Sequence, residues 1–339
     1  MKRDEAPCMT LFSAGFNACG QLSFEAGASG PEPDDLYSFT KTLSGQRIER
    51  PVSRLSYTLV RHDGRLSMAG IGPDKEDEQE AAYLFAEAAN DEILIAQRED
   101  SPETNETTTV PPTPLLQYAS VTSWKAGLVK QSWTPHSPVQ TMAAFDTGFV
   151  ILHDDGTVST LGDARFEDCL GRDVTKDSPA NLPGIVTDLS DLGEPMKHIS
   201  ASGYTLAALT ESGAMYVWGL PSRGLQRRPG AFPDLSRVPN YVEIDDGKDV
   251  QDMAVGDSHA LALTTDGLIY VIGGNDNGQL GLGESDADGR QSWTKSAFQP
   301  PNGHKVVAVA AGPRSSFILT ATEAVTLEEK QGQGVKDQG

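Results

Sequence analysis

Residues 250–283 read VQDMAVGDSHALALTTDGLIYVIGGNDNGQLGLG, and this stretch decides the fold. It contains three apolar runs, and the last two stand on either side of the pair Asp266–Gly267. Short apolar runs of this kind are typical of buried strands. An aspartate–glycine pair between such runs indicates a hairpin, because a tight primed turn needs positive φ. The tail of the stretch is rich in glycine and asparagine, as shaped loops are. It therefore predicts three strands followed by a loop.

The same order of signals returns along the chain. Residues 196–219, MKHISASGYTLAALTESGAMYVWG, form a second copy and residues 139–162 a third, while 55–70 and 89–127 are more degenerate copies. The turn glycines of the three best copies are 57 and 54 residues apart, at Gly156, Gly213 and Gly267. Repeats of about 50 residues are typical of propeller blades. The chain is therefore predicted to be a propeller.

The two ends of the chain complement each other. Residues 305–320, KVVAVAAGPRSSFILT, supply the first two strands of a repeat, and residues 9–22, MTLFSAGFNACGQL, supply a third strand and a loop. Together they make one whole repeat. An unpaired sheet edge exposes backbone donors and acceptors, and a ring avoids such edges by closing. We therefore predict an all-β, closed β-propeller whose last blade is closed by the N-terminal strand.

The repeat resembles that of the regulator-of-chromosome-condensation family, in which a pattern of glycine, strand, histidine, strand, Asp-Gly, strand and Trp-Gly recurs. Gly256, His259, Asp266 and Gly267 carry this pattern, and a neighbouring copy ends in Trp218–Gly219. The resemblance implies seven blades, although six copies are visible, and it places the missing blade within residues 23–138. The residues expected to hold the repeats together are Gly15, Gly20, Gly64, Gly156, Gly203, Gly213, Gly219, Gly256, His259, Gly267, Gly273 and Gly278.

Length and composition favour one domain. The chain has 339 residues with 34 glycines and 21 prolines, which suits a single all-β ring full of turns. We expect the propeller to span 1–322, with an inserted acidic helix or loop at about 73–114, because the apolar residues of 77–90 have helical spacing. Residues 323–339 are expected to be a disordered tail.

The net charge of −21 argues against direct binding to nucleic acid, because it repels phosphate backbones. The sequence has no apolar run of the roughly 20 residues that cross a bilayer and no signal peptide, so we expect no membrane contact. Three cysteines without a CxxC pair suit a reducing compartment and argue against an intrinsic zinc site. We expect a cytoplasmic protein that also occurs in the nucleus.

The sequence contains no nucleophile elbow, phosphate-binding loop or HExxH pair, so we expect neither catalytic residues nor a cofactor. His259 is interpreted as a buttress for neighbouring backbone. Residues 275–278 superficially match a calcium loop, but the glutamate of such a loop is missing, and turn geometry explains them better. The protein is therefore expected not to be an enzyme.

Aromatic residues and arginines on loops are the usual anchors of protein interfaces. The sequence offers five candidates for partner binding, and core packing remains an alternative for each aromatic: Trp133, His136, Tyr204, Arg223 and Trp293.

In size the chain resembles the short fungal members of the family, and this resemblance implies a function. It implies a non-enzymatic propeller that forms a heterodimer with the small zinc-binding electron carrier of diphthamide synthesis. It also implies a role with the Elongator complex in the modification of tRNA wobble uridines. The alternative is a guanine-nucleotide exchange factor for a Ran-type small GTPase, the activity of the founding member. A third option, a substrate adaptor for ubiquitin transfer, lacks an appended transfer domain in this sequence.

Overall fold

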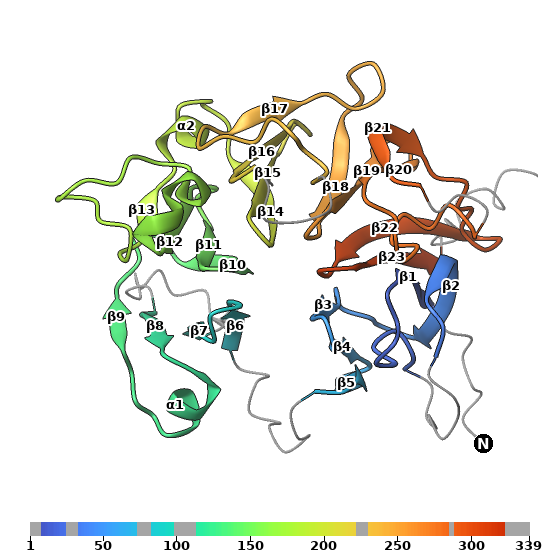
Figure 1. Ribbon diagram of the computed structural model, residues 1–339, viewed down its shortest axis with the longest axis horizontal. Coiled ribbons are helices and arrows are strands. Elements are labelled where there is room, and N and C mark those ends of the chain that lie inside the picture. The colour runs from blue at the N-terminus through green and yellow to red at the C-terminus, as the bar shows by residue number, and fades with distance from the viewer. Residues whose placement is uncertain are drawn as a thin grey trace, which may run out of the picture.

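The computed structural model describes residues 8–24, 33–72, 83–97, 113–221, 230–284 and 288–322. In these ranges the strands form six antiparallel sheets, which stand around a common centre like the blades of a propeller (Figure 1). The prediction of an all-β propeller is therefore confirmed. The prediction of seven blades is wrong: the described residues form six, which is the number of repeats visible in the sequence.

The six sheets are numbered here as blades in chain order. Blade 1 contains β3 (Val52–Ser53), β4 (Tyr57–His62) and β5 (Arg65–Gly70). Blade 2 contains β6 (Tyr83–Glu87), β7 (Ile93–Gln97), β8 (Leu115–Tyr118) and β9 (Gln131–Trp133). Blade 3 contains β10 (Val139–Phe145), β11 (Gly148–His153), β12 (Val158–Gly162) and β13 (Gly184–Ile185).

Blade 4 contains β14 (Met196–Ser202), β15 (Thr205–Thr210), β16 (Met215–Gly219) and β17 (Asn240–Val242). Blade 5 contains β18 (Val250–Val255), β19 (His259–Thr264), β20 (Ile269–Gly273) and β21 (Arg290–Lys295). Blade 6 contains β22 (His304–Ala311), β23 (Ser315–Thr322), β1 (Met9–Gly15) and β2 (Leu36–Gly45). Three short helical segments lie between strands: α1 (Val121–Lys125), α2 (Thr187–Ser190) and a 3-10 segment at Ala164–Leu170.

Blade 6 is assembled from both ends of the described chain. Strand β1 pairs with β23 in antiparallel register, from Met9 opposite Ala321 to Gly15 opposite Ser315. On its other side β1 pairs with β2, so the N-terminal strand lies inside the sheet. Leu11 and Leu319 face each other across this pairing and are both buried. The register places the third strand of blade 6 at the beginning of the sequence.

The hairpins between second and third strands share one geometry in blades 3, 4 and 5. In blade 5 the amide of Gly267 donates to the carbonyl of Thr264 at 2.9 Å, and the amide of Thr264 donates to the carbonyl of Leu268 at 2.9 Å. Gly267 has φ +80°, whereas Asp266 is not among the residues with positive φ. This is a three-residue loop with glycine in the left-handed region, and not the primed turn predicted from the aspartate–glycine pair. Asp63–Gly64 in blade 1, with φ 49° and 76°, fits the primed type.

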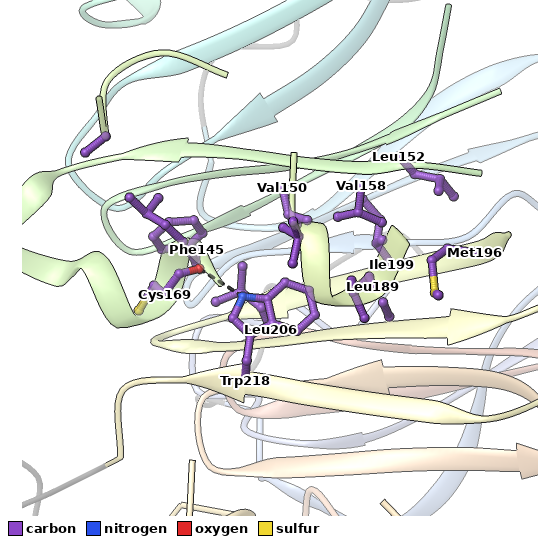
Figure 2. Packing of buried hydrophobic residues seen from close by; sticks show 14 residues of the cluster. Phe145, Val150, Leu152, Val158, Cys169, Leu189, Met196, Ile199, Leu206 and Trp218 are labelled. Atoms are coloured by element: carbon purple, nitrogen blue, oxygen red, sulfur yellow. Dashed lines mark hydrogen bonds between the residues drawn. The ribbon is translucent and has the colours of Figure 1, made fainter. Parts of the chain in front are cut away.

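Apolar side chains fill the spaces between neighbouring blades. Figure 2 shows the cluster between blades 3 and 4, where Phe145 and Val150 of one blade meet Leu206 and Trp218 of the next. The indole nitrogen of Trp218 donates to the carbonyl of Cys169 at 3.1 Å, which satisfies the polar atom of this buried ring. Similar clusters join blades 2 and 3, 4 and 5, 5 and 6, and 6 and 1. Blades 3 to 6 are therefore covered on both faces, which buries their strands.

The junction between blades 1 and 2 differs from the other five. The apolar cluster on this side of blade 2 contains residues of blade 2 and α1, with Phe85 and Trp124 at a ring-centroid distance of 5.4 Å. Among the described residues an ion pair crosses the junction, between Arg54 and Glu87 at 3.6 Å. Residues 73–82, which connect the two blades, lie outside the described ranges. Closure of the ring at this point stays a prediction.

The spacing of residues 77–90 predicts a helix, and for residues 83–90, the part that the structure describes, this prediction is wrong. Residues 83–87 form β6, which pairs with β7 from Tyr83–Gln97 to Glu87–Ile93. Pairing with a neighbouring strand thus overrides the local preference of alanine and leucine for a helix. Residues 83–97 accordingly belong to blade 2 and not to an insertion. The remainder of the predicted loop at 98–112 and the tail at 323–339 lie outside the described residues.

Within the described ranges, no helix combines the length and the apolar character needed to span a membrane.

Candidate protein-interaction face

The connections between the first and second strands of the blades gather at one end of the ring. They comprise residues 54–56, 88–92, 146–147, 203–204, 256–258 and 312–314, and we call this end the loop face. In an antiparallel blade the second strand runs away from this end and the third strand runs back to it, so the third strands also end on the loop face. The hairpins between second and third strands mark the opposite end. The loop face therefore brings together residues that lie far apart in the sequence.

In five blades the end of the third strand is hydrogen-bonded to the loop face. An amide just beyond the third strand donates to a carbonyl in the connection between the first and second strands. The five bonds run from Asp163 to Thr147, Leu220 to Tyr204, Gly274 to Ser258, Phe16 to Arg314 and Ile71 to Ser56, at 2.8–3.1 Å. Each bond holds a connection against its own blade, so the face is a fixed surface.

The glycines at the ends of the third strands make this contact possible. Gly219 has φ +136°, and a Cβ there would overlap the carbonyl oxygen of Tyr204. Gly273 has φ +105°, and a Cβ there would overlap the carbonyl oxygen of Ser258. A residue with a side chain would be strained by the positive φ at these positions, and its Cβ would overlap the carbonyl oxygen. The loop face thus explains why the repeat ends in glycine.

Two half-buried carboxyl groups, Asp146 and Asp257, lie in the loop-face connections of blades 3 and 5. Asp257 Oδ1 accepts a hydrogen bond from Ser202 Oγ at 2.7 Å, although the two residues belong to different blades. Burial, with a contribution from nearby Asp146, raises the pKa of Asp257 to about 6. Burial also raises the pKa of Asp146. Carboxyl groups held partly out of water gain from a positively charged partner, because such a partner restores the stabilisation that water no longer gives.

Each of these aspartates is tied by its backbone to the next blade. The amide of Asp146 donates to the carbonyl of Gly203 at 2.8 Å, and the amide of Asp257 donates to the carbonyl of Pro313 at 3.2 Å. The positions of the carboxyl groups are therefore set by the packing of blades and not by a flexible loop. A fixed charge can select a partner more sharply than a mobile one.

Aromatic rings lie beside the carboxyl groups. Tyr204 stacks on Phe166 with a ring-centroid distance of 5.2 Å and an interplanar angle of 19°. The guanidinium of Arg165 lies 5.8 Å from the centre of the Phe166 ring. Burial raises the pKa of Tyr204, and Asp146 adds to this shift. The thiol of Cys169 beneath them is buried with its pKa raised to about 12, so it stays protonated at neutral pH.

A second acidic part of the face surrounds a cavity of about 410 Å³ between blades 5 and 6. The loops that contain Asn17 and Asn275 both have asparagine and glutamine side chains folded back onto their own backbone. Asp35 joins the region by accepting from the amide of Asn17 and from the side chain of Asn277, both at 2.8 Å. The cavity is lined by Phe16, Ala18, Pro33, Asp34, Asp35, Tyr37 and Glu284. The loop face is therefore acidic over more than one blade.

His259 lies beneath the face and is fully buried. Its Nε2 lies 3.3 Å from the carbonyl of Ser315 in blade 6, and its ring fills the space that a side chain at Gly256 would need. Burial lowers the pKa of His259 to about 4, so the ring is neutral near pH 7. This position supports the loops and offers no contact to a partner.

Comparisons with known proteins agree with this architecture. The Regulator of chromosome condensation (RCC1) repeat matches residues 250–279 and 266–319. Mouse Regulator of chromosome condensation is 34% identical over 134 residues, which are 39% of this chain and 30% of that protein. Human E3 ubiquitin-protein ligase HERC2 is 31% identical over 188 residues, 55% of this chain and 4% of HERC2. The chain is an RCC1-like β-propeller.

Solved structures show the same fold for this RCC1-like propeller. Prp20p of Saccharomyces cerevisiae aligns with a TM-score of 0.56 and 14% identity, covering 95% of this chain and 93% of Prp20p. Human WBSCR16 aligns with a TM-score of 0.53 and 15% identity, covering 93% and 99% of the two chains. The region matched in the curated relatives named above is less than a third of their own length.

The partner-binding candidates chosen from the sequence are scattered over the RCC1-like propeller. Tyr204 lies on the loop face. Trp133 and Trp293 lie on outermost strands, where both are partly buried against apolar clusters. His136 lies at the opposite end, with its Nε2 2.7 Å from Thr157 Oγ1. Arg223 lies outside the described residues.

Sequence reasoning missed the two aspartates of the loop face. A signal for one was present, because Asp257 directly follows Gly256 in the best copy of the repeat. Asp146 occupies the matching connection of blade 3 without a preceding glycine. Within the described residues no group of three or more histidine, cysteine, aspartate or glutamate side chains is arranged to hold a metal ion.

Proposed function

We propose that this RCC1-like propeller is a non-enzymatic protein-interaction module that binds a Ran-type small GTPase through its loop face and promotes release of the bound nucleotide. The observation that carries the proposal is the pair of half-buried carboxyl groups, Asp146 and Asp257, fixed by bonds between blades. The likeness to Regulator of chromosome condensation and to Prp20p, which binds Gsp1p and histones, supports this choice of partner.

Nucleotide exchange requires binding to the GTPase, and no covalent bond is made or broken. A GTPase holds its nucleotide through positive groups around the phosphates, namely a lysine and Mg²⁺. A carboxylate presented beside them competes with the phosphates for these positive groups, and the bound nucleotide is then held less tightly. The chain's net charge of −21 adds long-range attraction for a basic surface of the partner.

The role in diphthamide synthesis and tRNA modification implied by the resemblance to short fungal members is not supported by the relatives named above. The exchange-factor alternative is therefore the better-supported function. A heterodimer with the zinc-binding electron carrier stays a prediction, and a pull-down with the purified carrier tests it. Location in cytoplasm and nucleus also stays a prediction.

The proposal is tested by the release of a fluorescent GDP analogue from a Ran-type GTPase in the presence of excess GTP. We expect the chain to accelerate release, and Asp257→Asn to slow the accelerated rate by about tenfold or more, as expected for a charge at the centre of an interface. Glu211→Gln, an exposed carboxylate at the opposite end of the ring, should leave the rate unchanged. No acceleration at micromolar concentrations of the chain would reject the proposal.

A further inference from the structure

Blade 1 is incomplete in a way that no other blade is. It has three strands, β3, β4 and β5, whereas each of the other five sheets has a fourth strand on the outside. In the described part of the chain β5 pairs with β4 alone. Its second edge therefore presents backbone donors and acceptors without a strand beside it.

Backbone hydrogen bonds of β4 show which groups of β5 point outward. The carbonyl of Arg61 accepts from the amide of Glu49, and the carbonyl of Tyr57 accepts from the amide of Arg54, both on the side away from β5. In antiparallel sheets, residues that do not bond to each other across a pair point their amides and carbonyls to opposite sides. Leu66, which pairs with Arg61, and Met68, two positions on, therefore direct their backbone groups to the free edge.

The two described residues after β5, Ile71 and Gly72, do not continue along this edge. Gly72 lies over the sheet, since a Cβ there would be 2.5 Å from the sulfur of Met68 and 2.8 Å from Cγ of Tyr57. Twelve residues, 71–82, lead from β5 to β6, whereas 20 to 36 residues lead from a third strand to the next first strand elsewhere, at 119–138 and 16–51 respectively. Residues 73–82, PDKEDEQEAA, are rich in types depleted from strands. The sequence of this connection is thus shorter than the others and low in residue types that favour strands.

The open side of blade 1 is apolar. Thr58, Val60 and Ala69 are buried on one face of the sheet. The opposite face carries Val52 and Leu66, with 51% and 41% of their surface exposed. Four of the eleven exposed large apolar residues of the described chain lie in this blade or beside it: Val52, Leu55, Leu66 and Ile71. Leu66 belongs to β5 and Ile71 directly follows it, whereas Val52 and Leu55 lie on and after β3, at the other edge of the sheet. Exposed apolar surface beside a free strand edge is characteristic of sites that accept another strand.

The charge of this region is opposite to that of the chain. Residues 47–65 contain five arginines and two acidic residues, whereas the whole chain carries −21. Arg50 and Arg54 are paired with Asp252 and Glu87. Arg65 is exposed at the start of β5, and no ion pair or side-chain hydrogen bond is found for it within the described residues. A strand beside β5 would therefore meet a positive charge at one end.

We infer that the free edge of β5 is a docking site for an extended segment of a partner protein, which adds to blade 1 as its fourth strand. The segment carries apolar side chains opposite Leu66 and Met68 and an acidic side chain near Arg65. Backbone hydrogen bonds supply affinity, and the alternation of apolar and acidic positions supplies selectivity. This site is separate from the loop face and does not depend on exchange activity.

The test uses two acetylated nine-residue peptides in which valine and threonine alternate with glutamate in one and with lysine in the other. Hydrogen exchange of residues 65–70 in the intact chain is followed by mass spectrometry with and without each peptide. We expect the glutamate peptide to slow exchange about tenfold or more at saturation, and the lysine peptide to have little effect. Leu66→Pro, which removes an outward amide while staying compatible with an edge position, should abolish the effect.

Leu66→Ala keeps the amide and serves as the matched control, so protection by the peptide should remain. Arg65→Glu should shift the preference toward the lysine peptide. Three results would overturn the inference: protection of 65–70 in the free chain, which indicates that its own segment or a second copy occupies the edge; equal effects of both peptides; or no effect of either at millimolar concentration. Thermal unfolding of each variant establishes that the ring is intact.

Discussion

The guanidinium of Arg50 and the carboxylate of Asp252 form an ion pair at 3.1 Å, although 202 residues separate them in the sequence. Arg50 precedes the first strand of blade 1, while Asp252 lies in the first strand of blade 5. The same guanidinium donates to the carbonyl of Val309 in blade 6 at 3.0 Å and lies 3.0 Å from Nε2 of His198 in blade 4. One side chain thus ties four blades together near the centre of the ring.

Replacement of Arg50 by methionine should lower the free energy of unfolding by about 1–3 kcal/mol. The side chain of Asp252 is 7% exposed, so loss of its partner leaves a buried charge that keeps a hydrogen bond from the amide of Val309. His198 Nε2 lies 3.7 Å from the same carboxylate, but burial lowers the pKa of His198 to about 4, so its ring is neutral near pH 7. Because Arg50 itself is 40% exposed, water compensates part of the loss and the lower half of this range is expected. Urea unfolding measures the change, with Arg65→Met, an exposed arginine, as a control near zero.

The repeats of blades 3 to 6 could be predicted from the sequence because their glycines have local causes. Gly219 and Gly273 are required where a third strand meets a carbonyl of its own blade, and this requirement leaves a visible spacing. Strand β6 could not be predicted in the same way. Its alanine, leucine and phenylalanine suit a helix, and only pairing with β7 makes them a strand.

The candidate site was harder to predict than the fold. The raised pKa of Asp257 depends on burial and on Asp146, which lies two blades away. Its hydrogen-bond partners, Ser202 and Pro313, come from two other blades. A sequence shows an aspartate after a glycine, but it does not show which neighbours remove water from that aspartate. The sequence instead predicts partner contacts for aromatic residues such as Trp133 and Trp293, and the structure places these two on outer strands.

Replacement of Gly219 by alanine should destabilise the ring by about 2–4 kcal/mol, because the added Cβ overlaps the carbonyl of Tyr204 and the residue has φ +136°. Gly267→Ala is the matched control. Gly267 has φ +80° with nothing within 4 Å of an added Cβ. Alanine at this position therefore has the conformational cost of about 1–2 kcal/mol without an added steric overlap. Chemical denaturation of both variants gives the comparison. Equal losses would show that the overlap at Tyr204 does not matter.

Replacement of Asp257 by asparagine should raise the free energy of unfolding over that of the wild type, and this gain should be larger at pH 7.5 than at pH 4.5. The folded-state pKa of about 6 lies above the ordinary value of 3.8, so the folded protein holds this proton more tightly than the unfolded chain does. Wild-type stability therefore falls as pH rises from about 4 to 6 and stays lower above that range. Asparagine removes this penalty, which is on the order of 2 kcal/mol.

The matched control for this change is Asp155→Asn. Asp155 is exposed and its pKa is lowered, chiefly by hydrogen bonds from Thr157 acting against burial, so its replacement should cost stability at pH 7.5 and not add to it. Stability curves against pH for both variants distinguish the two signs. A stability difference between Asp257→Asn and wild type that does not change between pH 4.5 and 7.5 would contradict the prediction.

Replacement of His259 by glutamine should flatten the loss of stability between pH 6.5 and 4. The folded-state pKa of about 4 lies below the ordinary value of 6.5 because the buried ring cannot easily accept a proton. The neutral imidazole of His259 therefore contributes its full stabilisation above pH 6.5. As pH falls from 6.5 toward 4, the free energy of unfolding decreases by up to about 3 kcal/mol, because the unfolded chain binds a proton that the folded protein does not. The variant is expected to be less stable at neutral pH, since the ring also fills the space beside Gly256.

The slope of stability against pH separates this electrostatic effect from the loss of packing, because a cavity lowers stability equally at every pH. Burial also lowers the pKa of His198 to about 4 and lowers the pKa of His153, so these two residues keep part of the slope in the His259→Gln variant. If His259→Gln retains the full wild-type slope, the buried imidazole beneath the loop face is not the group that titrates.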